Sequence, residues 1–160
     1  MKLICLVAVF LALGSCKKAE NNGGSIHVEQ HLKVSFVSSE KKDILKEIGN
    51  SAISKMRLYY LSQGKKVLYD NPNLTDRYGI QLMEPNDQTK LYQLQLLLNN
   101  VGTIGENIGS TTYLDWENGK VDTIVGYFFN DENNHILTKF KFNNVEGGLK
   151  EKQGLVIVRE

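Results

Sequence analysis

Apolar and polar residues alternate along most of the chain from residue 31 onward, and a period of two is typical of β-strands that bury one face. Leu32, Val34 and Phe36, for example, alternate with Lys33 and Ser35. The pattern recurs in the ranges 56–60, 65–69, 78–82, 92–98, 111–117, 120–129, 136–142 and 155–158. Such a chain is expected to fold as sheets whose inward side chains make a common core.

Many short strands separated by turns predict an all-β fold, and we expect an antiparallel, immunoglobulin-like β-sandwich of about 7–9 strands. The strands nearest the carboxyl end read as successive hairpins, so a lipocalin-like up-and-down β-barrel is the alternative. The helix candidate is 41–48, where Ile44, Leu45 and Ile48 share a helical face. The same segment fits a loop that covers one end of the core.

Two glycine-bearing turns predict β-hairpins. Gln63-Gly64 is one, and Asn118-Gly119 is the stronger, because both of its residues tolerate the positive φ of a type I′ turn. A two-residue turn there places Asp115 opposite Asp122 and Trp116 opposite Val121. The expected buried face is Leu114, Trp116, Val121, Thr123 and Val125, and the expected outward face is Tyr113, Asp115, Glu117, Asp122 and Ile124.

The first sixteen residues have the organisation of an export signal. Lys2 is followed by an apolar stretch, 3–13, which is too short to span a bilayer as a helix. The stretch ends in Leu13-Gly14-Ser15-Cys16. This ending resembles a bacterial lipoprotein signal, and the resemblance implies lipid attachment at Cys16 with cleavage before it. Two or three acyl chains on one cysteine give stable anchoring, because each buried CH₂ contributes about 0.8 kcal/mol.

The expected organisation is therefore a signal peptide at 1–15, a lipidated cysteine with a flexible tether at 16–30, and a β-sandwich domain at 31–160. The resemblance implies a place in the cell envelope and partnership with a membrane through Cys16. An aspartate directly after the lipidated cysteine signals retention in the inner membrane. Lys17 occupies that position here, so the outer membrane is favoured. The periplasmic and surface-facing sides of that membrane both stay open.

Charge and cysteine content exclude several classes of function. Without Lys2 the chain of 160 residues carries 18 basic and 18 acidic residues, so nothing indicates a nucleic-acid partner. Cys5 and Cys16 are the two cysteines of the chain, and removal of the signal with lipidation of Cys16 would leave no thiol for catalysis or metal binding. No phosphate-binding loop or nucleophile elbow is present, and we expect no cofactor, no metal and no enzymatic activity.

The segment from His31 to Asn144 resembles small Bacteroidota lipoproteins with a single immunoglobulin-like domain. The motifs that carry the resemblance are Leu58-Tyr59-Tyr60, Thr112-Tyr113-Leu114-Asp115-Trp116, Gly119 and Asp122-Thr123-Ile124. The resemblance implies a fold and an envelope location, and it implies no particular activity.

Four residues are candidates for a binding site. Tyr59 and Tyr113 fall at positions that could face outward, where flat rings stack on sugars or on partner proteins. Asp115 and Asp122, if opposite each other, would repel unless a cation lies between them, and paired acids also serve in glycoside hydrolysis.

We expect a membrane-anchored, non-enzymatic binding or accessory domain with an envelope protein or a glycan as its partner. The alternative is a small ligand or glycan carrier, or a minor hydrolase that uses Asp115 and Asp122. A deep, largely apolar cavity above about 300 Å³ would favour the carrier.

Overall fold

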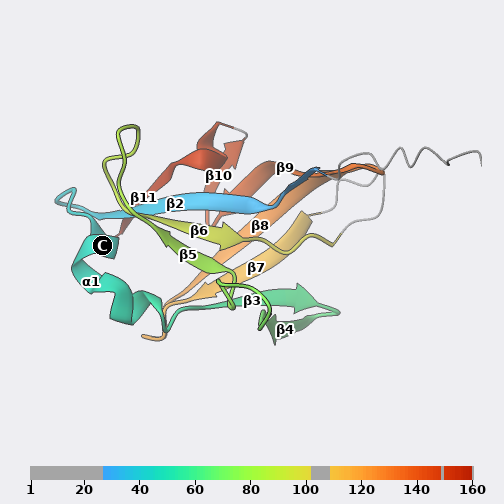
Figure 1. The fold of residues 1–160 in the computed structure, drawn as a ribbon, viewed down its shortest axis with the longest axis horizontal. Coiled ribbons are helices and arrows are strands. Elements are labelled where there is room, and N and C mark those ends of the chain that lie inside the picture. Colours follow the sequence, from blue (N-terminus) through green and yellow to red (C-terminus); the bar gives the residue numbers. More distant parts are fainter. Residues whose placement is uncertain (1–26, 102–108, 149, 160) are drawn as a thin grey trace, which may run out of the picture.

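A computed structural model describes residues 27–101, 109–148 and 150–159 of the chain. These residues form two β-sheets packed face to face, shown as two layers in Figure 1, and the sheets do not close into a barrel. The predicted sandwich is therefore confirmed, and the alternative of an up-and-down barrel is wrong. The predicted signal peptide, Cys16 and the tether up to residue 26 lie outside the described residues.

The larger sheet has seven strands. Six of them follow the order β1-β9-β8-β7-β3-β4, and β10 also pairs with β9. Their bounds are β1 His27–Glu29, β3 Arg57–Ser62, β4 Lys65–Leu68, β7 Gly109–Asp115, β8 Val121–Asn130, β9 Asn134–Phe142 and β10 Val145–Gly148. β1 falls within the segment that the sequence assigned to the tether, and it pairs with β9. The folded domain thus includes residues 27–29.

The smaller sheet has four strands in the order β11-β2-β6-β5. Their bounds are β2 His31–Ser38, β5 Ile80–Met83, β6 Gln93–Leu97 and β11 Leu155–Arg159. A short 3₁₀ turn, η1 (Glu151–Gln153), leads into β11.

Both sheets are mixed, in contrast to the antiparallel arrangement expected from the sequence. β1 runs parallel to β9, and β11 runs parallel to β2. The described residues form eleven strands, more than the 7–9 expected. A parallel partner cannot be joined by a tight turn, so these two pairings bring together segments far apart in the chain.

The helix candidate is confirmed as α1 (Ile44–Ile53), which lies at one end of the sandwich (Figure 1). Asp43 caps its N-terminus, because Oδ1 accepts hydrogen bonds from the backbone N–H groups of Leu45 and Lys46. Oδ2 of the same carboxylate accepts one from the N–H of Tyr92, at 2.7 Å. A single side chain thus joins the helix to the segment that enters β6.

The core lies between the sheets and is made of the inward side chains of both. Leu32, Val34 and Phe36 of β2 are fully buried, as the alternation predicted. The predicted Gln63-Gly64 hairpin is also confirmed, since Ser62 pairs with Lys65 and both turn residues have positive φ, 50° and 76°. Packing is close enough that Phe140 covers Gly147 on β10, where an added Cβ would meet the ring at 2.2 Å.

Candidate functional site

The two candidate carboxylates do not face each other. The ladder between β7 and β8 pairs Asp115 with Val121 and Leu114 with Asp122, one residue away from the predicted register. Because side chains alternate across a strand, a slip of one residue places the side chains of β8, Asp122 among them, on the face opposite to the predicted one. Asp115 lies on the outward side, whereas Asp122 is 6% exposed and points into the sandwich.

The register differs because the loop is longer than a two-residue turn. The N–H of Trp116 donates to the carbonyl of Lys120 at 3.0 Å, and Glu117 adopts a φ of 64°. Two side chains stabilise this loop: Asp115 Oδ1 accepts from the N–H of Glu117, and Asn118 Oδ1 accepts from the N–H of Lys120. Asp115 therefore has a local structural role at the loop.

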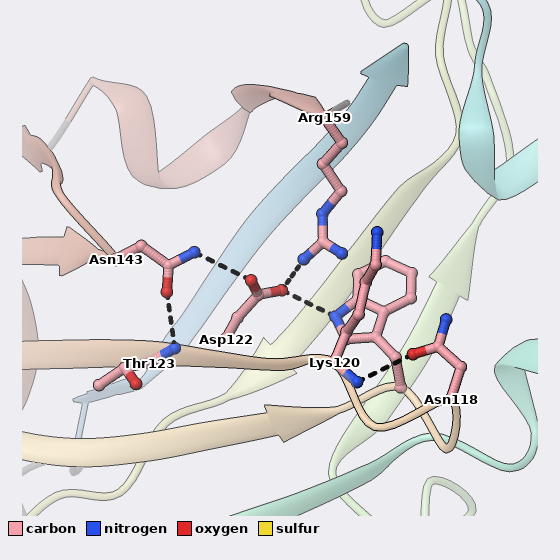
Figure 2. Close-up of polar contacts among 7 residues, drawn as sticks. Asn118, Lys120, Asp122, Thr123, Asn143 and Arg159 are labelled. Atoms are coloured by element: carbon pink, nitrogen blue, oxygen red, sulfur yellow. Dashed lines mark hydrogen bonds and ion pairs between the residues drawn. The ribbon is translucent and has the colours of Figure 1, made fainter.

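Asp122 is the centre of a buried polar cluster, shown in Figure 2. Its Oδ2 accepts a hydrogen bond from Trp116 Nε1 at 2.7 Å and forms an ion pair with the guanidinium of Arg159. Its Oδ1 accepts from Asn143 Nδ2 at 2.9 Å. Asn143 Oδ1 in turn accepts from the N–H of Thr123. Three donors contact the carboxylate, so they offset the free-energy cost of removing its charge from water.

Arg159 belongs to the other sheet and completes the cluster. Its guanidinium carbon lies 4.1 Å from the ring centroid of Trp116 and 4.8 Å from that of Phe36. Burial lowers the pKa of Arg159 from its ordinary value, and the charge and hydrogen bond of Asp122 oppose that shift. The guanidinium of arginine stays charged in proteins, so the cluster is an ion pair that ties β11 to β8 between the sheets. It has no arrangement for acid–base catalysis by Asp115 and Asp122, because their carboxylates lie on opposite faces.

Tyr59 and Tyr113 do lie together. They are cross-strand partners on β3 and β7, on the side of the large sheet that faces away from the core. Lys66 of β4 places its ammonium 4.0 Å from the ring centroid of Tyr113. Asp115 occupies the same side, where it is the cross-strand partner of Arg57.

These tyrosines belong to a larger apolar surface, which we call the outer face. On β8 the burial alternates along the strand, and every second side chain points away from the core. Phe129 is 51% exposed, Val121 42% and Leu68 40%. The outer face comprises Tyr59, Leu68, Tyr113, Val121, Val125, Tyr127, Phe129 and Ile136. An antiparallel sheet with one solvated face normally carries polar side chains there.

Lysines flank the outer face on both sides. Lys66 lies on β4 at one side, and Lys139 and Lys141 lie on β9, as the partners of Tyr127 and Val125. Lys139 forms an exposed ion pair with Glu146 at 3.5 Å. An apolar centre with a charged rim is the usual composition of a protein–protein interface.

A partly open cleft of about 340 Å³ lies against the small sheet. Its lining combines Leu74, Thr75, Asp76 and Gly79 of the preceding loop with His31, Gln81, Gln95 and Leu97 of the strands. Burial lowers the pKa of His31 from its ordinary value; the charge of Lys33 also lowers it, and Asp76 and Glu29 oppose the shift. The cleft is partly open to solvent, and the polar side chains of His31, Asp76 and Gln95 share its lining with the apolar side chains of Leu74 and Leu97.

The sequence reasoning missed two groups of residues. It placed Val121, Thr123 and Val125 in the core, whereas they point outward, and it assigned no role to Arg159. A sequence signal for the first group was present, since apolar side chains occur in both alternating sets of Val121–Phe129: Val121, Val125, Tyr127 and Phe129 in one set, and Ile124 and Phe128 in the other. Trp116 was correctly expected in the core, where it is 8% exposed.

Within residues 27–101, 109–148 and 150–159, no group of three or more His, Cys, Asp or Glu side chains is arranged to hold a metal ion. In the same part of the chain no helix has the length and apolar character needed to cross a bilayer. Comparisons with protein-family models, with curated proteins and with solved structures found no match to this chain.

Proposed function

We propose that this chain is a lipid-anchored, non-enzymatic accessory domain of a bacterial cell envelope that binds a protein partner through its outer face. Anchoring at Cys16, with the outer membrane as the favoured membrane, rests on the lipoprotein-like ending Leu13-Gly14-Ser15-Cys16. The immunoglobulin-like form of the sandwich is part of this proposal, supported by the two packed sheets and the consecutive hairpins β7–β8–β9.

The outer face is the observation that carries the proposal. β8 presents Val121, Val125, Tyr127 and Phe129 outward while Ile124 and Phe128 point into the core, so apolar side chains stand on both of its faces. Strands of this composition normally have both faces covered. A contiguous exposed apolar surface with a polar rim marks an interaction site.

A protein partner fits this surface better than a glycan. Sugars stack on aromatic rings, but the branched aliphatic side chains of Val121, Val125 and Ile136 offer no flat platform. The ring face of Tyr113 is also occupied by the Lys66 ammonium. Aromatic and aliphatic groups surrounded by Lys66, Lys139 and Lys141 match an apolar partner surface with acidic residues at its edge.

The anchor is tested by replacing Cys16 with Ala in the full chain. We expect the variant to leave the membrane fraction while its β-sheet circular dichroism spectrum stays unchanged, because the anchor and the core are separate. The measurement is fractionation of cells that express each chain, followed by immunoblotting. A variant that stays in the membrane fraction would contradict a lipid anchor at Cys16.

The outer face is tested by crosslinking the chain in native envelopes and identifying the captured protein. Truncating two aromatic side chains of the outer face, Tyr113→Ala and Phe129→Ala, is expected to weaken binding of that protein more than tenfold, because buried aromatic anchors dominate interfaces. Leu74→Ala, an exposed apolar side chain in the loop beside the smaller sheet, is the matched control and should bind like the wild type.

Two results would overturn this assignment. One is a partner that binds the Tyr113 and Phe129 variants as tightly as the wild type. The other is capture of a polysaccharide in place of a protein, which would assign the outer face to glycan binding.

A further inference from the structure

β11 has the features of a sheet edge that pairs with another strand. Among the described residues it pairs with β2 and stands last in its sheet. Within β11, Leu155 and Ile157 point into the core and are buried, whereas Val156 and Val158 point outward and are 50% and 66% exposed. A sheet edge presents unpaired backbone N–H and C=O groups, and proteins normally protect such an edge with charged residues, proline or a covering element.

The other edges in the described structure carry such protection. β4 begins with two lysines, Lys65 and Lys66. β5 lies beside α1, since Leu82 and Gly49 line one crevice and Ile80 and Ile53 line another. β1 and β10 are short, and they carry Glu29 and Glu146.

β11 by contrast reads Leu-Val-Ile-Val before its terminal arginine. The guanidinium of Arg159 is engaged with Asp122 between the sheets, so it does not protect the edge. The same ion pair holds the end of the strand in place, so the edge is preformed.

We propose that β11 pairs antiparallel with β11 of a second copy of this chain. A two-fold axis at Ile157 places Val156 of each copy opposite Val158 of the other and joins the two four-stranded sheets into one of eight strands. The pairing is isologous, because the same surface serves both partners. It covers the exposed valines and satisfies the open backbone groups of both edges at once.

The absence of charge on this edge suits pairing with a second copy of the same edge. Residues 155–158 carry no ionisable side chain, so two copies approach without repulsion. A two-fold pairing of β4 centred on Lys66 would set the Lys66 side chains of the two copies opposite each other, and like charges facing each other across a ladder are destabilising. The outer face is on the other sheet, so the dimer leaves it open to a different partner.

The pairing is tested by disulfide crosslinking of the full chain in membranes. Cysteines introduced as Val156→Cys and Val158→Cys in one chain would face each other across the two-fold axis at the Cα separation of about 4.5–5.5 Å found for paired strands, which suits a disulfide. We expect oxidation to convert most of the chain into a covalent dimer on a non-reducing gel.

The matched control is Lys65→Cys with Val67→Cys, which has the same spacing on the β4 edge and should give little dimer. Equal crosslinking of the two variants, or none with the β11 pair, would overturn the proposal. A second measurement is sedimentation of the full chain in detergent. Val158→Lys should weaken self-association at least tenfold and Val67→Lys should not, and a wild-type chain that stays monomeric up to about 1 mM would also overturn it.

Discussion

Replacing Asp122 with Asn is expected to lower the free energy of unfolding by about 3–5 kcal/mol, the cost of breaking a buried ion pair by changing one partner. The carboxylate is buried and accepts from Trp116 and Asn143 as well as from Arg159. Asparagine keeps one acceptor oxygen and leaves the guanidinium buried without its counter-charge. The measurement is urea unfolding of both chains followed by circular dichroism.

Asp115→Asn is the control, because Asp115 lies on the outward side of the neighbouring strand and can keep its hydrogen bond to the N–H of Glu117. It should change the stability by no more than about 0.5 kcal/mol. The prediction for Asp122 opposes what the sequence implied, since a facing pair of acids would be relieved by the same substitution. A stability of Asp122→Asn equal to or above that of the wild type would show that the pair with Arg159 does not form.

Trp116→Ala is expected to cost about 3–5 kcal/mol, the range for removing a large aromatic side chain from a core. The indole meets the Phe36 ring edge-on, with centroids 4.8 Å apart, and lies beneath the Arg159 guanidinium. The change therefore leaves a cavity and also removes a hydrogen-bond donor to Asp122. The measurement is again urea unfolding, followed by circular dichroism because Trp116 is the single tryptophan of the chain.

Trp116→Phe separates these two contributions. Phenylalanine fills most of the space but cannot donate to Asp122, so it should cost about 1–3 kcal/mol, the penalty for an unsatisfied buried acceptor. Near-native stability of Trp116→Ala, together with wild-type fluorescence typical of exposed indole, would contradict the buried position.

Local pattern was sufficient to predict most strands and one of the two turns. Leu32, Val34 and Phe36 were correctly assigned to the core because the residues between them are polar or small. The Gln63-Gly64 turn was correctly predicted because its geometry depends only on residues within it. Asn118-Gly119 has the stronger hairpin signal, yet the side chains of Asp115 and Asn118 stabilise a longer loop.

The error in register came from the assumed length of the turn. Val121, Thr123 and Val125 were placed inward because a two-residue turn at Asn118-Gly119 sets Val121 opposite the buried Trp116. On β8 the outward side is itself apolar, so hydrophobicity did not distinguish the two faces. The buried position of Asp122 depends on Arg159, which is distant in sequence, and no local pattern indicates that contact.

The parallel pairing of β11 with β2 has a consequence for how the domain is made. β11, the last described strand, pairs with β2, the first strand of the smaller sheet in chain order. Almost the whole sequence of the domain therefore lies between the two paired segments. Contacts of such long range slow folding, because the chain must close a large loop before they form. Until β11 arrives, β2 is an open edge and Asp122 lacks its counter-charge. The core between the two sheets is therefore incomplete until residues 155–159 have been synthesised and have paired with β2.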